Sequence, residues 1–94
     1  MNFIKINEHF EITEGSTYEL VNDRWCSITS PGTLRALPRG SIADAWAENA
    51  IAESCAIGSI AESWVPGAIA KASAHGAHVR AFVHGAISIP YYSE

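Results

Sequence analysis

The sequence has few cysteines, few basic residues and no long apolar run. Two cysteines in 94 residues, Cys26 and Cys55, are too few for the disulfide framework of many small secreted domains. Six Lys and Arg against ten Asp and Glu give a net charge of −4, which argues against a protein that binds nucleic acid through phosphate contacts. The uncharged stretches are much shorter than a membrane span. We therefore expect a cytoplasmic protein that binds neither nucleic acid nor a membrane.

The chain has the length and composition of one small folded domain. Its 94 residues match the usual size of a single domain, and a hydrophobic share of 48% is enough to bury a core. The composition changes near residue 30, after which Ala, Gly, Ser and Ile dominate. We therefore expect a single domain over residues 1–94, with one part at residues 1–30 and a second at residues 31–93.

Residues 1–30 predict short antiparallel strands. Apolar side chains alternate with polar ones around Ile4 and again from Phe10 to Ile12, which is the period of a strand. Turn-forming residues follow at 14–16 and at 22–23. We predict a short β-meander that caps one end of the second part, because stacked strands need their open edges covered.

A repeat of nine residues organises residues 31–93. Written in lines of nine from Pro31, the chain forms seven lines, such as GSIADAWAE and GSIAESWVP. The third position of the line is mostly Ile, the fifth is charged in six of seven lines, and the even positions are mostly small. The first position is Gly or Asn in six of seven lines, and these residues adopt positive φ at low cost. The predicted turn residues are Gly40, Asn49, Gly58, Gly67, Gly76 and Gly85.

The repeat favours stacked β-coils over helices. Ala and Glu are good helix formers, so the alternative is an α+β fold with N-terminal hairpins and Ala-rich helices. Against helices, a Gly in every line would cost about 1 kcal/mol each, and the large apolar residues are β-branched or aromatic, as strands prefer. We predict an all-β fold, in which a short N-terminal β-meander precedes a small β-solenoid of nine-residue repeats.

The charged fifth position indicates how many repeats one coil holds. Stacking each line on the next would place Asp44, Glu53 and Glu62 side by side. Stacking every second line instead alternates the signs of Arg35, Glu53 and Lys71. Neighbouring strands lie about 4.8 Å apart, so like charges in one row repel. We therefore predict a coil of two repeats, about 18 residues, in a solenoid of about three and a half coils.

Stacking every second line leaves one like-charged pair, Asp44 and Glu62, in the row Asp44–Glu62–Arg80.

The same stacking predicts a candidate interface on one side of the solenoid. Strand alternation separates the small side chains from the Ile, charged and aromatic positions, and charged rows belong in solvent. The small residues should then form a thin inner layer, and an exposed apolar row would mark an interface unless the N-terminal segment covers it. The predicted interface residues are Ile42, Trp46, Ile60, Trp64, His78 and Phe82.

Side chains that could carry catalysis or bind a metal are weakly arranged. His75, His78 and His84 lie close in sequence, but no cysteine or carboxylate lies beside them to complete a tetrahedral site. Cys55 occupies a repeat position that Trp or Ser fills elsewhere, and Cys26 has no histidine at a telling spacing. We predict no catalytic residue, no cofactor and no metal.

These patterns favour a non-enzymatic protein-binding or assembly module. Its Ile and aromatic face would contact another protein or a second copy of the chain, and a two-fold homodimer is favoured because this symmetry is the commonest. A second interpretation, by analogy of size and charge, is a small virus-encoded inhibitor of a host defence complex, similar to the anti-CRISPR proteins, which acts by protein–protein binding in the host cytoplasm. A third is a small enzyme or metal site at His75, His78 and His84.

Overall fold

The chain forms an all-β structure. In this computed structural model, which describes residues 2–91, there are eleven strands and no helix. The all-β prediction is confirmed, and the Ala-rich helices of the alternative are absent from the described residues. The strands are β1 (Phe3–Lys5), β2 (Phe10–Thr13), β3 (Tyr18–Asn22), β4 (Trp25–Ile28), β5 (Gly32–Ala36), β6 (Ile42–Ala45), β7 (Ala50–Ser54), β8 (Ile60–Ser63), β9 (Ile69–Ala72), β10 (His78–Ala81) and β11 (Ile87–Ile89).

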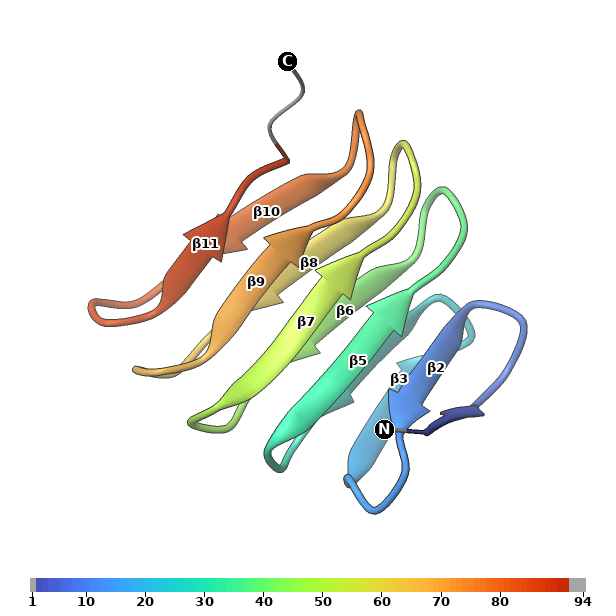
Figure 1. Cartoon of the computed structure of the whole chain (residues 1–94), viewed down its shortest axis with the longest axis horizontal. Coiled ribbons are helices and arrows are strands. Elements are labelled where there is room, and N and C mark those ends of the chain that lie inside the picture. The colour runs from blue at the N-terminus through green and yellow to red at the C-terminus, as the bar shows by residue number, and fades with distance from the viewer. Residues whose placement is uncertain (1, 92–94) are drawn as a thin grey trace.

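The strands make two sheets that face each other. Sheet A has the order β1-β2-β5-β7-β9-β11, and sheet B has the order β10-β8-β6-β4-β3. From β4 onward, successive strands alternate between the sheets and form four stacked coils (Figure 1). Ile42, Ile60 and His78 are register neighbours in parallel strands, as are Ile51, Ile69 and Ile87 in the other sheet. The predicted coil of two repeats is therefore confirmed.

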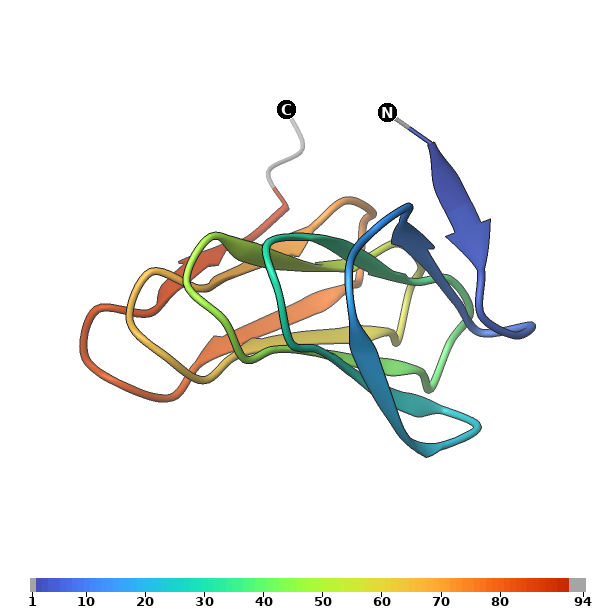
Figure 2. The same ribbon diagram turned by 90° about the horizontal axis from the view of Figure 1, so that it is seen from below.

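The N-terminal segment differs from a continuous meander. β1 pairs with β2 and β3 pairs with β4, both antiparallel, but β2 lies in sheet A and β3 in sheet B. β2 instead pairs antiparallel with β5, and β4 pairs in parallel with β6. The coils therefore begin at β4, before Pro31, and β1 to β3 extend both sheets at this end (Figure 2). The step from Trp25 to its register neighbour Ile42 is one position shorter than two repeats, which hides β4 from the repeat pattern.

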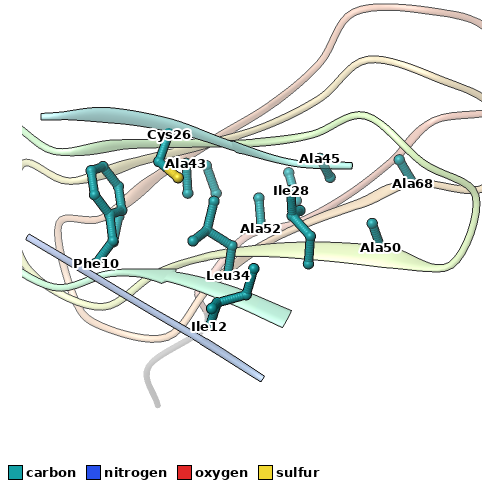
Figure 3. Packing of buried hydrophobic residues seen from close by; sticks show 13 residues of the cluster. Phe10, Ile12, Cys26, Ile28, Leu34, Ala43, Ala45, Ala50, Ala52 and Ala68 are labelled. Atoms are coloured by element: carbon teal, nitrogen blue, oxygen red, sulfur yellow. The ribbon is translucent and has the colours of Figure 1, made fainter. Parts of the chain in front are cut away.

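A thin layer of small side chains fills the space between the sheets. Ala43, Ala52, Ala61 and Ala70 are fully buried and point inward from the successive strands β6 to β9. The four largest buried side chains gather toward the N-terminal end, where β2 packs on the first coil (Figure 3). The capped end therefore has bulky packing, and the later coils have the small-residue layer that the repeat predicts. Those four side chains are Phe10, Ile12, Ile28 and Leu34.

Serine hydroxyls join the two sheets across this layer. Ser54 Oγ in sheet A donates to the carbonyl oxygen of His78 in sheet B at 3.1 Å. Ser63 Oγ in sheet B donates to the carbonyl oxygen of Ile87 in sheet A at 3.0 Å. A short side chain can reach the opposite backbone only where two sheets lie close together. The small residues of the repeat therefore permit both close packing and satisfied polar groups.

The coils turn at the glycine and asparagine positions of the repeat. All six residues that the repeat assigns to turns have positive φ, from 67° at Asn49 to 89° at Gly85. At one such corner the Ala50 N–H donates to the carbonyl oxygen of Ala47 at 3.0 Å, which closes a β-turn. The corners also stack, because the Asn49 N–H donates to the carbonyl oxygen of Gly67 in the next coil at 3.1 Å. The corners therefore hold successive coils in register as the strands do.

Candidate interaction surface

The outer face of sheet B carries three parallel rows of side chains, two with one residue from each of the four coils and one with residues from the last three. The rows follow the parallel register of β4, β6, β8 and β10. We call them the apolar row (Trp25, Ile42, Ile60 and His78), the acid row (Ser27, Asp44, Glu62 and Arg80) and the aromatic row (Trp46, Trp64 and Phe82).

The aromatic row is a continuous stack of rings. The ring centroids of Trp46 and Trp64 are 5.2 Å apart with an interplanar angle of 1°, and those of Trp64 and Phe82 are 4.1 Å apart with an angle of 11°. Trp64 is half-buried between its neighbours, whereas Trp46 and Phe82 remain 45% and 44% exposed. Because the two-repeat register fixes this spacing, stacking adds to sheet pairing and leaves the ring edges in solvent.

The acid row lies between the other two rows, and its two carboxylates are nearly covered. Asp44 is 2% exposed and Glu62 is 8% exposed. Trp25 Nε1 donates to Asp44 Oδ2 at 2.7 Å, and Arg80 Nη1 lies 3.9 Å from Glu62 Oε2. Asp44 Oδ1 is buried without a hydrogen-bond partner among residues 2–91. Our expectation that this charged row is solvated is therefore wrong for Asp44 and Glu62, because the large side chains on either side cover them.

The acid row changes its charge near neutral pH. Burial and the neighbouring Asp44 together raise the pKa of Glu62 to about 7, while Arg80 lowers it in part. A protonated Glu62 relieves the repulsion between the two carboxylates and can donate to Asp44. The centre of the face thus gains one negative charge, on Glu62, as the pH rises through about 7.

All six predicted interface residues lie on this outer face. Ile42, Ile60 and Trp64 are half-buried, and Trp46, His78 and Phe82 are exposed. Sequence reasoning missed Trp25, which is 37% exposed and extends the apolar row by one coil. Its shorter step to Ile42 put it outside the repeat. Alternation within 25–28 is the signal that could have found it, because Trp25 and Ser27 point to the face opposite Cys26.

The outer face of sheet A carries an ion-pair network. Arg35 Nη1 lies 3.0 Å from Glu11 Oε1, and Arg35 Nε lies 3.0 Å from Glu53 Oε1. The Arg35 guanidinium also lies 3.7 Å from the centre of the Phe3 ring. A shallow cavity of about 270 Å³ borders Arg35, Glu53, Phe3 and Lys71. The parallel register contains the predicted row of Arg35, Glu53 and Lys71. Arg35 is paired with Glu53 of this row and also with Glu11 of β2.

The histidines of the metal hypothesis lie at the last coils. His75 is exposed and meets the Tyr91 ring edge-on, with centroids 6.5 Å apart and an angle of 82°. His78 points outward from β10, and His84 is exposed at the following corner. Within residues 2–91, no group of three or more His, Cys, Asp or Glu side chains is placed to hold a metal ion.

Both cysteines are free thiols in partly or fully apolar surroundings. Burial raises the pKa of Cys26 to about 12, and the carboxylate of Asp44 raises it as well. Burial and the nearby Glu53 raise the pKa of Cys55 to about 11. Because a thiolate is the reactive form, both groups are poor nucleophiles at neutral pH.

No protein-family model, no curated protein and no solved structure matches the chain. Across residues 2–91 there is also no helix with the length and apolar character needed to cross a membrane.

Proposed function

We propose that the chain is a non-enzymatic protein-binding module whose contact surface is the outer face of sheet B. The observation that carries this proposal is the group of exposed aromatic side chains on one sheet. Trp25, Trp46 and Phe82 are 37%, 45% and 44% exposed, and they lie on the same face as the half-buried Trp64. Contiguous exposed apolar surface of this kind marks contact sites, and aromatic residues are enriched in them.

The shape of this face favours a protein over a small molecule. Small-molecule sites are concave and enclose the ligand. One cavity of about 400 Å³ is lined by Asn7, Glu8, His9 and Asp23, and another borders the Arg35 network of sheet A. Neither is lined by the aromatic row. A sheet with parallel rows of rings instead supports contact with another broad surface, on another protein or on a second copy of the chain.

Two further features support a binding role in the cytoplasm. The thiols of Cys26 and Cys55 are free, which suits a reducing compartment, and their raised pKa values make them poor nucleophiles.

An affinity capture with matched variants tests the proposed surface. We would immobilise the wild-type chain, Trp46→Ala and Ile57→Ala, and pass extract of the cells that produce the chain over each. Trp46 and Ile57 are 45% and 55% exposed, but Ile57 is at a corner away from the aromatic row. A partner retained by the wild type and by Ile57→Ala should be lost with Trp46→Ala, and the purified pair should show at least tenfold weaker binding. Equal retention by all three chains would contradict the proposed surface.

A further inference from the structure

The C-terminal end of the solenoid is open. β10 ends sheet B and β11 ends sheet A, and within residues 2–91 each pairs with a strand on one side only (Figure 2). Ala81 and Ser88 occupy inward positions in this last coil but are exposed. Their register neighbours one coil earlier, Ser63 and Ala70, are fully buried. The end therefore exposes both backbone groups and part of the inner layer.

Large apolar side chains surround this open end. Phe82, Ile87, Ile89 and Tyr91 are each between 41% and 44% exposed. One face of the Phe82 ring stacks on Trp64, and no ring among the described residues stacks on its other face. Unpaired strand edges beside exposed apolar groups form a template for another strand. A second copy of this chain offers two such edges at once.

The geometry of a coil selects how two copies can meet. Each coil advances by one strand spacing, about 4.8 Å, and contains two strands. β11 therefore lies about half a spacing, or roughly 2.4 Å, farther along the solenoid axis than β10. A two-fold axis perpendicular to the sheets would pair β11 with itself but leave the two β10 strands about twice the normal spacing apart. A two-fold axis parallel to the strands pairs β10 of each copy with β11 of the other, and both gaps then equal one spacing.

We propose that two copies of the chain dimerise end to end through their last coils, with β10 of one copy antiparallel to β11 of the other. Head-to-tail stacking fits less well, because the N-terminal end adds two strands to sheet A but one to sheet B, so β1 and β3 do not have the stagger that would pair with β11 and β10 at the same time. The fifth repeat position is the midpoint of each side of the coil, so Arg80 lies opposite the partner's Ile89. The same register places Phe82 opposite the partner's Ile87 and His78 opposite the partner's Tyr91.

This register is chemically complementary. Each facing pair joins a charged, polar or aromatic side chain to an apolar or aromatic one, so no like charges face each other. The aromatic row of one copy continues from Phe82 to the partner's Ile87. The apolar row continues in the same way from His78 to the partner's Tyr91. Both rows of the outer face of sheet B thus extend across the dimer.

The unpaired backbone groups also match. The His78 N–H donates to Ser59 on the β8 side, so the N–H and carbonyl of Ala81 point to the open side. The Ile87 N–H donates to Ala68 on the β9 side, so Ser88 points to the open side. Ala81 and the partner's Ser88 are therefore opposite each other and can exchange two hydrogen bonds. Pro90 has no N–H, which limits the ladder beyond this pair.

Sedimentation equilibrium tests the dimer and separates it from the proposed aromatic-face contact. The wild type should sediment at twice its 10.1 kDa chain mass, with a Kd that Ile89→Lys raises at least tenfold. Trp46→Ala should leave this Kd unchanged, because Trp46 lies two coils from the open end. A wild type that stays monomeric up to millimolar concentration would overturn the dimer and leave the aromatic-face proposal untouched. Loss of dimerisation in Trp46→Ala, with Ile89→Lys unaffected, would place self-association on the face and overturn the end contact.

Cysteine cross-linking tests the register. Arg80 and Ile89 point outward from opposite sheets of one chain, so a disulfide between them cannot form within a copy. Across the proposed interface they face each other as a non-hydrogen-bonded pair with Cα atoms about 4.5 Å apart, which suits a disulfide. In a Cys55→Ser background, oxidation should give covalent dimers with Arg80→Cys/Ile89→Cys and very few with either single change. Efficient dimers from Arg80→Cys alone would show β10 paired with itself and overturn the register.

Discussion

The two ends of the solenoid differ in how they close the space between the sheets. At the N-terminal end, the large side chains of the added strand β2 and of the first coil, Phe10, Ile12, Ile28 and Leu34, are fully buried between the sheets. At the C-terminal end, inward-facing Ala81 is exposed. The repeat supplies only a thin layer of small residues, which is sufficient between coils but leaves a terminal coil uncovered. Each end of such a stack therefore needs bulky residues from outside the repeat or another surface.

The largest expected effect is loss of the bulky packing at the capped end. Phe10→Ala should lower the free energy of unfolding by about 3–5 kcal/mol, because it removes a fully buried ring and leaves a cavity. Ile87→Ala at the open end should cost less than about 1 kcal/mol, because the side chain is 44% exposed. Urea unfolding at a concentration where the chain is monomeric measures both. Similar losses for the two variants would contradict the contrast between the ends.

The acid row should make the free energy of unfolding depend on pH, because the pKa of Glu62 is raised in the folded chain. The two carboxyl groups of the row have different partners. Asp44 accepts a hydrogen bond from Trp25 on the capped side, whereas Glu62 has Arg80 at 3.9 Å on the open side. Burial raises the pKa of Glu62 from 4.5 to about 7, so the folded chain holds this proton more tightly than the unfolded chain. The free energy of unfolding should then fall as pH rises from about 4.5 to about 7, by on the order of 2–3 kcal/mol.

Glu62→Gln tests the source of this pH dependence. The amide cannot ionise and can still donate to Asp44, so most of the decline between pH 4.5 and 7 should disappear. Glu48→Gln, at an exposed corner, removes the same charge without touching the acid row and is the matched control. An unchanged pH profile in Glu62→Gln would assign the dependence to other groups.

Corners of the same type occur along the whole solenoid. The effect of a corner substitution on stability should therefore not depend on its distance from the capped end. Gly67 has a φ of 82°, and a Cβ there would lie 2.8 Å from Glu48 Cγ. Gly67→Val should cost about 1–3 kcal/mol, because a β-branched residue resists positive φ. Gly67→Asn should cost clearly less, since Asn49 already occupies an equivalent corner. Equal thermal melting of Gly67→Val and the wild type would contradict the role of these corners.

The smallest expected effect is a difference in thiol reactivity between the capped end and the middle of the stack. Cys26 is fully buried, and Cys55 is half-buried on the outer side of sheet A. With pKa values raised to about 12 and about 11, both should react with iodoacetamide at pH 7.5 at least ~100-fold more slowly than a free thiol. Cys26 should be the slower of the two. Mass spectrometry after timed alkylation measures each rate, and rapid modification of Cys55 would revive a nucleophilic role.

The repeat itself was predictable because its signals are local and recur. Positive φ at Gly67, the alternating row of Arg35 and Glu53, and the stack of Trp46 and Trp64 all follow from side-chain type at fixed spacing. A coil of two repeats brings each residue type onto its own kind or onto its opposite charge. The sequence alone therefore determined the coil length, the corners and the rows on the outer faces.

Tertiary structure decided what lies outside that periodicity. Trp25 joins the outer face through a step shorter than two repeats, and Phe10 reaches the core because β2 pairs antiparallel with β5. The burial of Asp44 depends on which large side chains flank it, and the exposure of Ala81 depends on having no coil beyond it in the described residues. These properties arise from contacts between segments far apart in the chain, which a local pattern of residue types does not specify.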